Sequence, residues 1–195
     1  MTIKINYSNK PSGKFSSNIV FFVDENFNIN TLKKQISDVE FSYISDLLRN
    51  SDLKKNLLFF EINSKKKIFL ISVKKSLETS DIENLGAEFH GYINYDNKSE
   101  YFVNSDSSNG KFENLIGYFL HGLKLKSYEF NIYKSKKDAN IISINITGNK
   151  NKKIIKSELR FKAIEEGTFF ARDLVSEPPN VLNPKEYVNR LLKLR

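Results

Sequence analysis

The sequence contains no cysteine and no tryptophan, and only one methionine among its 195 residues. The absence of cysteine excludes disulfide bonds, thiolate metal ligands and a cysteine nucleophile. No apolar run reaches the roughly 18 residues that a membrane-spanning helix needs. The first ten residues, MTIKINYSNK, lack the apolar core of a secretory signal. Together these absences favour a cytoplasmic protein without a membrane partner.

Glycine and histidine are too few, and too scattered, to form a recognisable ligand site. The eight glycines include no G-x-G and no P-loop, so a phosphate cradle is not indicated. His90 and His121 are 31 residues apart, without the spaced carboxylates of a metal site or the nucleophile elbow of a serine hydrolase. We interpret both histidines as ordinary residues on the surfaces of two helices.

The formal net charge is +8, and the excess lies between residues 101 and 160, where 11 basic residues face 5 acidic ones. Such a segment can attract nucleic acid or another polyanion. However, the chain has 26 lysines, only 5 arginines and only 4 alanines. This pattern is typical of a codon bias that raises the lysine content without a binding role. Arginine, whose guanidinium group is the usual bidentate donor to bases and phosphates, is rare.

Several short apolar runs predict strands. The run NIVFFVD at 18–24 is rich in β-branched and aromatic residues, which favours a strand buried on both faces. Residues 57–62 and 67–73, separated by the polar turn NSKKK, predict a hairpin. The alternating residues 3–7 predict an edge strand. Further strands are expected in EYFVN, in residues 128–133 and in residues 141–146.

Helices are expected between these strands. In the stretch that begins at Ser80, this serine and Glu83 have capping-box spacing before a helical apolar pattern. A broad apolar stripe predicts a second helix over residues 111–123. From about residue 154 a long helix is expected, with Ile164, Gly167, Ala171 and Leu174 at packing intervals. The predicted fold is a layered α/β domain with a mixed β-sheet flanked by helices, followed by this long connecting helix.

Residues that break helices mark the end of the long helix. Pro178 and Pro179 follow Glu177 and should stop it near Ser176. A new helix should then begin with Asn183 as N-cap and Pro184 in the first turn. Its apolar face, formed by Val188, Leu191 and Leu192, has no evident partner in the sequence, so we expect this helix to be partly exposed.

The stretch ARDLVSEPPNVLNP resembles the domain junction of the leucyl aminopeptidases, also called cytosol aminopeptidases. In this family an Arg-Asp-Leu stretch, a Pro-Pro-Asn and a further proline recur at this spacing. The upstream segment GYFLHGLKLKSYEFNIYKSKK is also similar to the family, with Tyr128, Phe130, Tyr133 and Lys134 at the positions of its aromatic-rich passage. The resemblance implies an N-terminal α/β domain over 1–152, a connecting helix over 153–176 and the opening of a truncated peptidase domain over 177–195.

Family members are two-domain metallopeptidases that form hexamers. The resemblance implies a parent enzyme in which two divalent ions, zinc or manganese, activate water for the removal of N-terminal residues from peptides. The family's metal motifs, GKG, DTGG and NTDAEGR, do not occur here. We therefore expect no catalytic residue and no metal ligand in this chain, and no activity of the chain alone. TSDIENLG at 79–86 echoes the last motif but lacks its glycine-arginine pair, so we interpret it as a helix start.

The residues assigned to the junction are expected to be structural, because they set the direction in which the chain enters the second domain. They are Arg172, Asp173, Pro178, Pro179, Asn180, Asn183 and Pro184. Arg172 and Asp173 either take part in contacts between domains or subunits, or form a solvated pair beside the helix end. The alternative function is a free-standing α/β binding module that contacts nucleic acid through the basic segment 101–160.

Overall fold

A computed structural model of the chain describes residues 2–7, 17–74, 76–94, 100–108, 114–135, 141–148 and 151–194, with only the backbone for 151–156. The strands are β1 (Thr2–Tyr7), β2 (Asn18–Asp24), β3 (Leu57–Asn63), β4 (Lys66–Val73), β5 (Glu100–Asn104) and β6 (Ile141–Thr147). The α-helices are α1 (Asp38–Arg49), α2 (Thr79–Asn94), α3 (Leu115–Lys126), α4 (Asn151–Ser176) and α5 (Pro184–Leu192). Short 3-10 helices cover Asn30–Leu32 and Ser105–Ser108.

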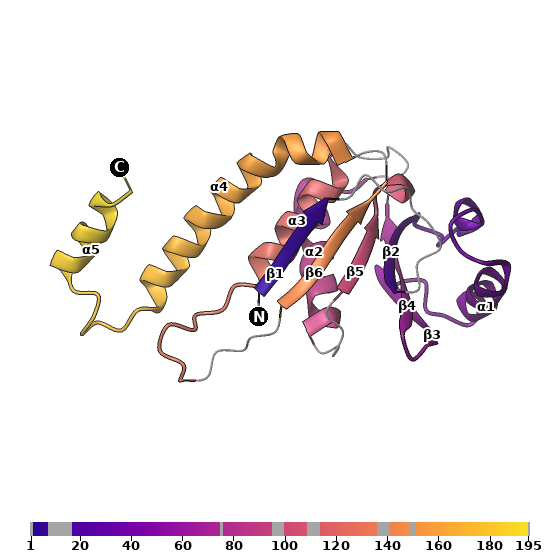
Figure 1. The fold of residues 1–195 in the computed structure, drawn as a ribbon, viewed down its shortest axis with the longest axis horizontal. Helices are drawn as coiled ribbons and strands as arrows, with labels where there is room; N and C mark the ends of the chain where they lie inside the picture. Colours follow the sequence, from indigo (N-terminus) through magenta and orange to yellow (C-terminus); the bar gives the residue numbers. More distant parts are fainter. Residues whose placement is uncertain are drawn as a thin grey trace.

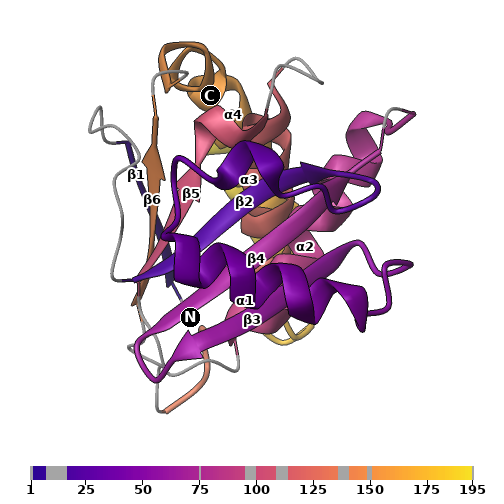
Figure 2. The same ribbon diagram turned by 90° about the vertical axis from the view of Figure 1, so that its right-hand side faces the viewer.

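The strands form one six-stranded sheet in the order β1-β6-β5-β2-β4-β3. Its neighbouring strands are parallel, except for the antiparallel pair of β3 and β4. Helices α2 and α3 cover one face of the sheet and α1 covers the other (Figures 1 and 2). This is the predicted mixed sheet flanked by helices, with the 57–73 hairpin and the edge strand at residues 3–7 in their expected places.

Strand β2 explains why the sheet has a core on both faces. Val20 and Phe22 point into the cluster beneath α2 and α3, whereas Phe21 and Val23 point into the cluster beneath α1. All four side chains are buried. A strand between two helical layers needs apolar residues at successive positions, which is the pattern read from NIVFFVD.

The structure differs from the sequence analysis at two helices. Helix α2 begins at Thr79, so Ser80 lies inside it, and the backbone N–H of Glu78 instead donates to the carboxylate of Asp81 at 2.9 Å. Helix α1 was not predicted from the sequence. Its start carries a complete capping box, in which Ser37 Oγ accepts from the Glu40 N–H and the Glu40 carboxylate accepts from the Ser37 N–H.

Two further expectations are wrong for reasons of tertiary structure. Residues 128–133 are not a strand but an irregular segment with a turn, which passes beside the end of α4. On α4, Ile164, Gly167 and Ala171 are exposed, and an added Cβ at Gly167 would meet nothing within 4 Å. The helix packs through a different face, which includes Phe161.

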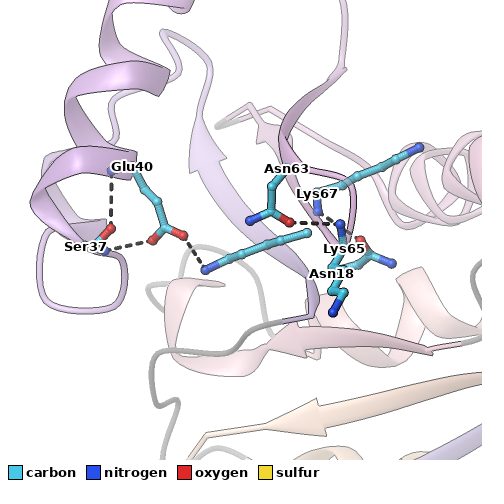
Figure 3. Close-up of polar contacts among 7 residues, drawn as sticks. Asn18, Ser37, Glu40, Asn63, Lys65 and Lys67 are labelled. Atoms are coloured by element: carbon cyan, nitrogen blue, oxygen red, sulfur yellow. Dashed lines mark hydrogen bonds and ion pairs between the residues drawn. The ribbon is translucent and has the colours of Figure 1, made fainter.

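A buried ion pair joins α1 to the hairpin. Lys66 Nζ lies 2.6 Å from Glu40 Oε1, and the exposed fractions of the two side chains are 8% and 14%. In Figure 3 dashed lines join Glu40 to Ser37 and to an unlabelled side chain, which is the Lys66 partner of this ion pair. Both charges are largely removed from water, so each would be unfavourable without the opposite charge beside it.

The same pair predicts a pH dependence of stability. Burial alone would raise the pKa of Glu40, but hydrogen bonds from Lys66 and Ser37 and the lysine charge lower it below its ordinary value of 4.5. The unfolded chain therefore binds a proton at a higher pH than the folded chain does. Stability should be fully present above pH 4.5 and fall as the pH drops through the folded value. In urea unfolding, the free energy of unfolding of Glu40→Gln should fall less between pH 5 and pH 3 than that of the parent. An equal fall in the two proteins would contradict this prediction.

Candidate functional site: the helical junction

Helix α4 is fastened to the α/β body along its first half. Asn114, which precedes α3, hydrogen-bonds the Ser157 hydroxyl at 2.9 Å. His121 Nδ1 lies 3.0 Å from Glu165 Oε1, and the His121 ring packs on Phe161 with a centroid distance of 4.9 Å. His121 is thus a buried residue that joins two helices. His90 is buried as well, so the prediction of two surface histidines is wrong.

The predicted junction residues Arg172 and Asp173 form a compact contact with the end of α3. Arg172 donates from its Nη1 to the carbonyl of Leu125 at 2.6 Å, and its guanidinium lies over the Tyr128 ring. The Tyr128 hydroxyl donates to Asp173 Oδ1 at 2.7 Å. Burial, followed by this hydrogen bond, raises the pKa of Tyr128. The pair is therefore tied to its own chain, and the picture of two solvated charges beside a helix end does not hold.

The prolines end α4 where the sequence predicts. The helix stops at Ser176, and the Glu177 N–H closes its last turn on the Asp173 carbonyl at 3.0 Å. The Pro178 carbonyl then accepts from the N–H groups of Val181 and Leu182, both at 2.9 Å. Pro179 and Asn180 lie in this turn and are exposed. The turn reverses the chain within a few residues, so that α5 starts in a fixed position.

The start of α5 also follows the sequence. Asn183 is the N-cap, its Oδ1 accepts from the Glu186 N–H at 3.0 Å, and Pro184 occupies the first turn. The Glu186 carboxylate does not complete a capping box, because the described contact of its Oε1 is with Arg190 Nε at 3.1 Å. This (i, i+4) pair could have been read from the spacing alone.

Glu177 connects α5 to the body, a role that the sequence did not reveal. Its carboxylate accepts from the hydroxyl of Tyr133 and from Arg190 Nη1, the latter at 2.9 Å. The hydrogen bond from Tyr133 and the contact with Arg190 lower the pKa of Glu177, while the carboxylate raises the pKa of Tyr133. Tyr133 is 44 residues from Glu177, so only the fold brings them together.

Helix α5 itself is largely open to solvent. None of its residues is buried, and Val188, Leu191 and Leu192 are 52%, 38% and 56% exposed. Figure 1 shows α5 at the far end of the molecule, beyond the end of α4 and away from the sheet. The prediction of a partly exposed final helix is confirmed, and the helix presents an apolar face without a partner among the described residues.

The Tyr128 contact predicts a measurable contribution to stability. Tyr128→Phe removes the hydroxyl that bonds Asp173 but keeps the ring under Arg172. A side-chain hydrogen bond of this kind contributes about 1 kcal/mol, so urea unfolding should show a loss of about that size. Phe130→Leu, in the same segment but without such a hydroxyl, is the matched control. A Tyr128→Phe variant as stable as the parent would contradict the assigned role.

The described residues offer no recognisable metal centre. Within the described ranges, no group of three or more His, Cys, Asp or Glu side chains is placed to hold an ion. None of the helices in the same ranges is long and apolar enough to cross a bilayer.

Several curated proteins similar to this chain are named as probable cytosol aminopeptidases. A "Probable cytosol aminopeptidase" of Nitrobacter winogradskyi is 30% identical over 141 residues, which cover 66% of this chain and 27% of that protein. A protein of the same name from Agrobacterium fabrum is 36% identical over 83 residues, covering 40% of this chain and 17% of its own length. The match thus spans about a quarter or less of these relatives. No protein-family profile matches the chain.

Solved structures show the same fold. A mutant of tomato leucine aminopeptidase superposes with a TM-score of 0.73 and 17% identity, over 98% of this chain and 42% of that one. The bottromycin maturation enzyme BotP in complex with Mn gives a TM-score of 0.62 and 14% identity, over 92% of this chain and 36% of that one. The class of the chain is thus the α/β fold found in leucine aminopeptidase. The sequence relatives and this fold together support the leucyl aminopeptidase (cytosol aminopeptidase) family, with partial coverage of the chain.

Proposed function

We propose that the chain is the N-terminal part of a cytosolic leucyl-type metalloaminopeptidase, whose whole removes N-terminal residues from peptides. The observation that carries this proposal is the pairing of 30% identity over 141 residues with a fold match over 98% of the chain. In this proposal residues 1–152 are the α/β domain, 153–176 the connecting helix and 177–195 the opening of the peptidase domain.

In such an enzyme the role of this chain is scaffolding and assembly. Helix α4 is held to the body by Asn114, His121 and Arg172, so it can place the next domain at a defined distance and angle. The exposed apolar face of α5 is suited to packing against that domain or a neighbouring subunit. We propose a homohexamer as the working assembly, and peptides as its substrates.

The proposed parent enzyme uses two divalent ions, zinc or manganese. When bound, they would supply an activated water and a Lewis acid for the peptide carbonyl. We assign the metal ligands to the peptidase domain of the parent, because the metal motifs of the family do not occur in this sequence. The alternative, a free-standing module that binds nucleic acid through residues 101–160, is not favoured by the relatives, whose names are those of aminopeptidases.

Sequencing the coding DNA beyond the codon for Arg195, and assaying its full product, tests the proposal. We expect the lysine and acidic metal motifs of the family downstream, and hydrolysis of leucine 4-nitroanilide that a chelator abolishes. The 195-residue chain alone should show no hydrolysis under the same conditions. A stop codon directly after Arg195, together with salt-sensitive retardation of DNA by the chain, would overturn the proposal in favour of the binding module.

A further inference from the structure

A pocket of about 320 Å³ lies between the edge strand β1 and helices α3 and α4. Its volume is at the lower end of the range of small-molecule sites, about 300 to 1,000 Å³. Ile5 from β1, Leu120 from α3 and Phe161 from α4 give it an apolar lining. Figure 1 shows β1 and α3 at the end of the sheet opposite to α1, and the α4 residues that line the pocket lie between positions 158 and 165, before the junction. The pocket is therefore separate from the junction.

The charges that line the pocket differ between its sides. Helix α4 contributes the carboxylates of Glu158 and Glu165, with one ammonium group from Lys162. The opposite side, formed by β1 and α3, contributes the ammonium groups of Lys4 and Lys124 and no carboxylate. The Lys162 side chain is mostly exposed, and its Nζ lies 3.9 Å from Oε1 of Glu166 on the same helix. One side of the pocket is thus mainly acidic and the other basic.

Burial disfavours the charged form of two of these groups. The Glu165 side chain is 15% exposed, and burial raises its pKa although His121 lies 3.0 Å from its Oε1. Burial lowers the pKa of Lys124, whose Nζ donates to the carbonyl of Ile3 at 2.5 Å. An ammonium group has three donors and a carboxylate has two acceptor oxygens. Both groups therefore keep hydrogen-bonding capacity after these contacts.

We propose that this pocket binds a free α-amino acid with an aliphatic or aromatic side chain. Its ammonium group would meet Glu158 and Glu165, its carboxylate would meet Lys4 and Lys124, and its side chain would lie against Phe161 and the neighbouring apolar residues. A ligand with both charges is required, because an anion alone would face the two carboxylates and a cation alone would face the two lysines. This inference does not depend on the proposed peptidase activity, because it concerns binding alone.

Titration of the 195-residue chain with L-leucine, followed by NMR of the Ile5 and Leu120 methyl groups, tests the proposal. We expect saturable shifts with a Kd in the millimolar range or below. Leucine amide, which lacks the carboxylate, and 4-methylpentanoate, which lacks the ammonium group, should each bind at least about tenfold more weakly, since each loses one charge-assisted contact. No saturable shift with leucine, or equal binding of 4-methylpentanoate, would overturn it.

Two variants and a control locate the site. Lys124→Met should weaken leucine binding at least about tenfold. Glu158→Gln concerns an exposed residue and should leave the fold intact while weakening binding about threefold or more. Lys185→Met removes a lysine from α5, outside the pocket, and should bind leucine as the parent does. If Glu158→Gln and Lys185→Met bind leucine equally well, the assigned ammonium contact is wrong and the proposal fails.

Discussion

Gly122→Ala is expected to destabilise the fold by about 4 kcal/mol or more, which is exceptional for one methyl group. Gly122 lies on α3, where an added Cβ would stand 1.9 Å from the backbone oxygen of Glu83 on α2. The reciprocal position Gly86, on α2, would place a Cβ 2.0 Å from the backbone oxygen of Phe119. Because backbone atoms cannot move aside as a flexible side chain can, the two helices would have to separate.

Gly91→Ala is the matched control for this prediction. Gly91 also lies inside α2, but an added Cβ there would meet nothing within 4 Å. Alanine should therefore stabilise the helix by about 0.5 to 1 kcal/mol. Urea unfolding followed by circular dichroism measures both changes. If Gly122→Ala unfolds at the same urea concentration as the parent, the close approach of α2 and α3 is not as described.

Lys66→Met is expected to cost about 3 kcal/mol. The substitution leaves the Glu40 carboxylate without its ammonium partner in a site where only 14% of the side chain is exposed. Breaking a buried pair from one side costs about 3 to 5 kcal/mol. We expect the lower end of that range, because the Ser37 N–H still donates to the other oxygen of Glu40 at 2.9 Å.

The neighbouring lysine provides the control for the buried pair. Lys67 lies 3.0 Å from Glu61, but the Glu61 side chain is 63% exposed. An exposed pair contributes about 0 to 1 kcal/mol, so Lys67→Met should change the free energy of unfolding by no more than that. Adding Glu40→Gln to Lys66→Met should recover part of the loss, since the unpaired charge is removed. Equal effects of the two lysine substitutions would contradict the assigned burial.

Strongly patterned segments were predictable from the sequence. The run at 18–24 is apolar at successive positions because β2 is covered by helices on both faces, and this requirement is visible without the fold. The end of α4 at Ser176 and the cap at Asn183 could also be predicted, because proline and asparagine act through local backbone geometry. The start of α1 carried a comparable signal in Ser37 and Glu40, and it could have been recognised.

What depended on distant partners was not predictable. Residues 128–133 have the composition of a strand, but the Tyr128 and Tyr133 hydroxyls reach Asp173 and Glu177 instead of pairing in the sheet. His121 was read as a surface residue because its partner Glu165 is 44 positions away on another helix. The role of Glu177 escaped the sequence for the same reason. Within the junction, local geometry could be predicted and the contacts that tie it to the body could not.

We propose that this α/β body and its junction serve a peptidase domain of the leucyl aminopeptidase type. A chimera that joins residues 1–180 of this chain to the corresponding peptidase portion of the Nitrobacter winogradskyi relative tests this proposal. Its hydrolysis of leucine 4-nitroanilide is compared with that of the relative and of an N-terminally deleted form of the relative. We expect the chimera to assemble like the relative, to hydrolyse the substrate within about tenfold of the relative's rate and to be more active than the deleted form. A folded chimera that neither assembles nor exceeds the deleted form would contradict it.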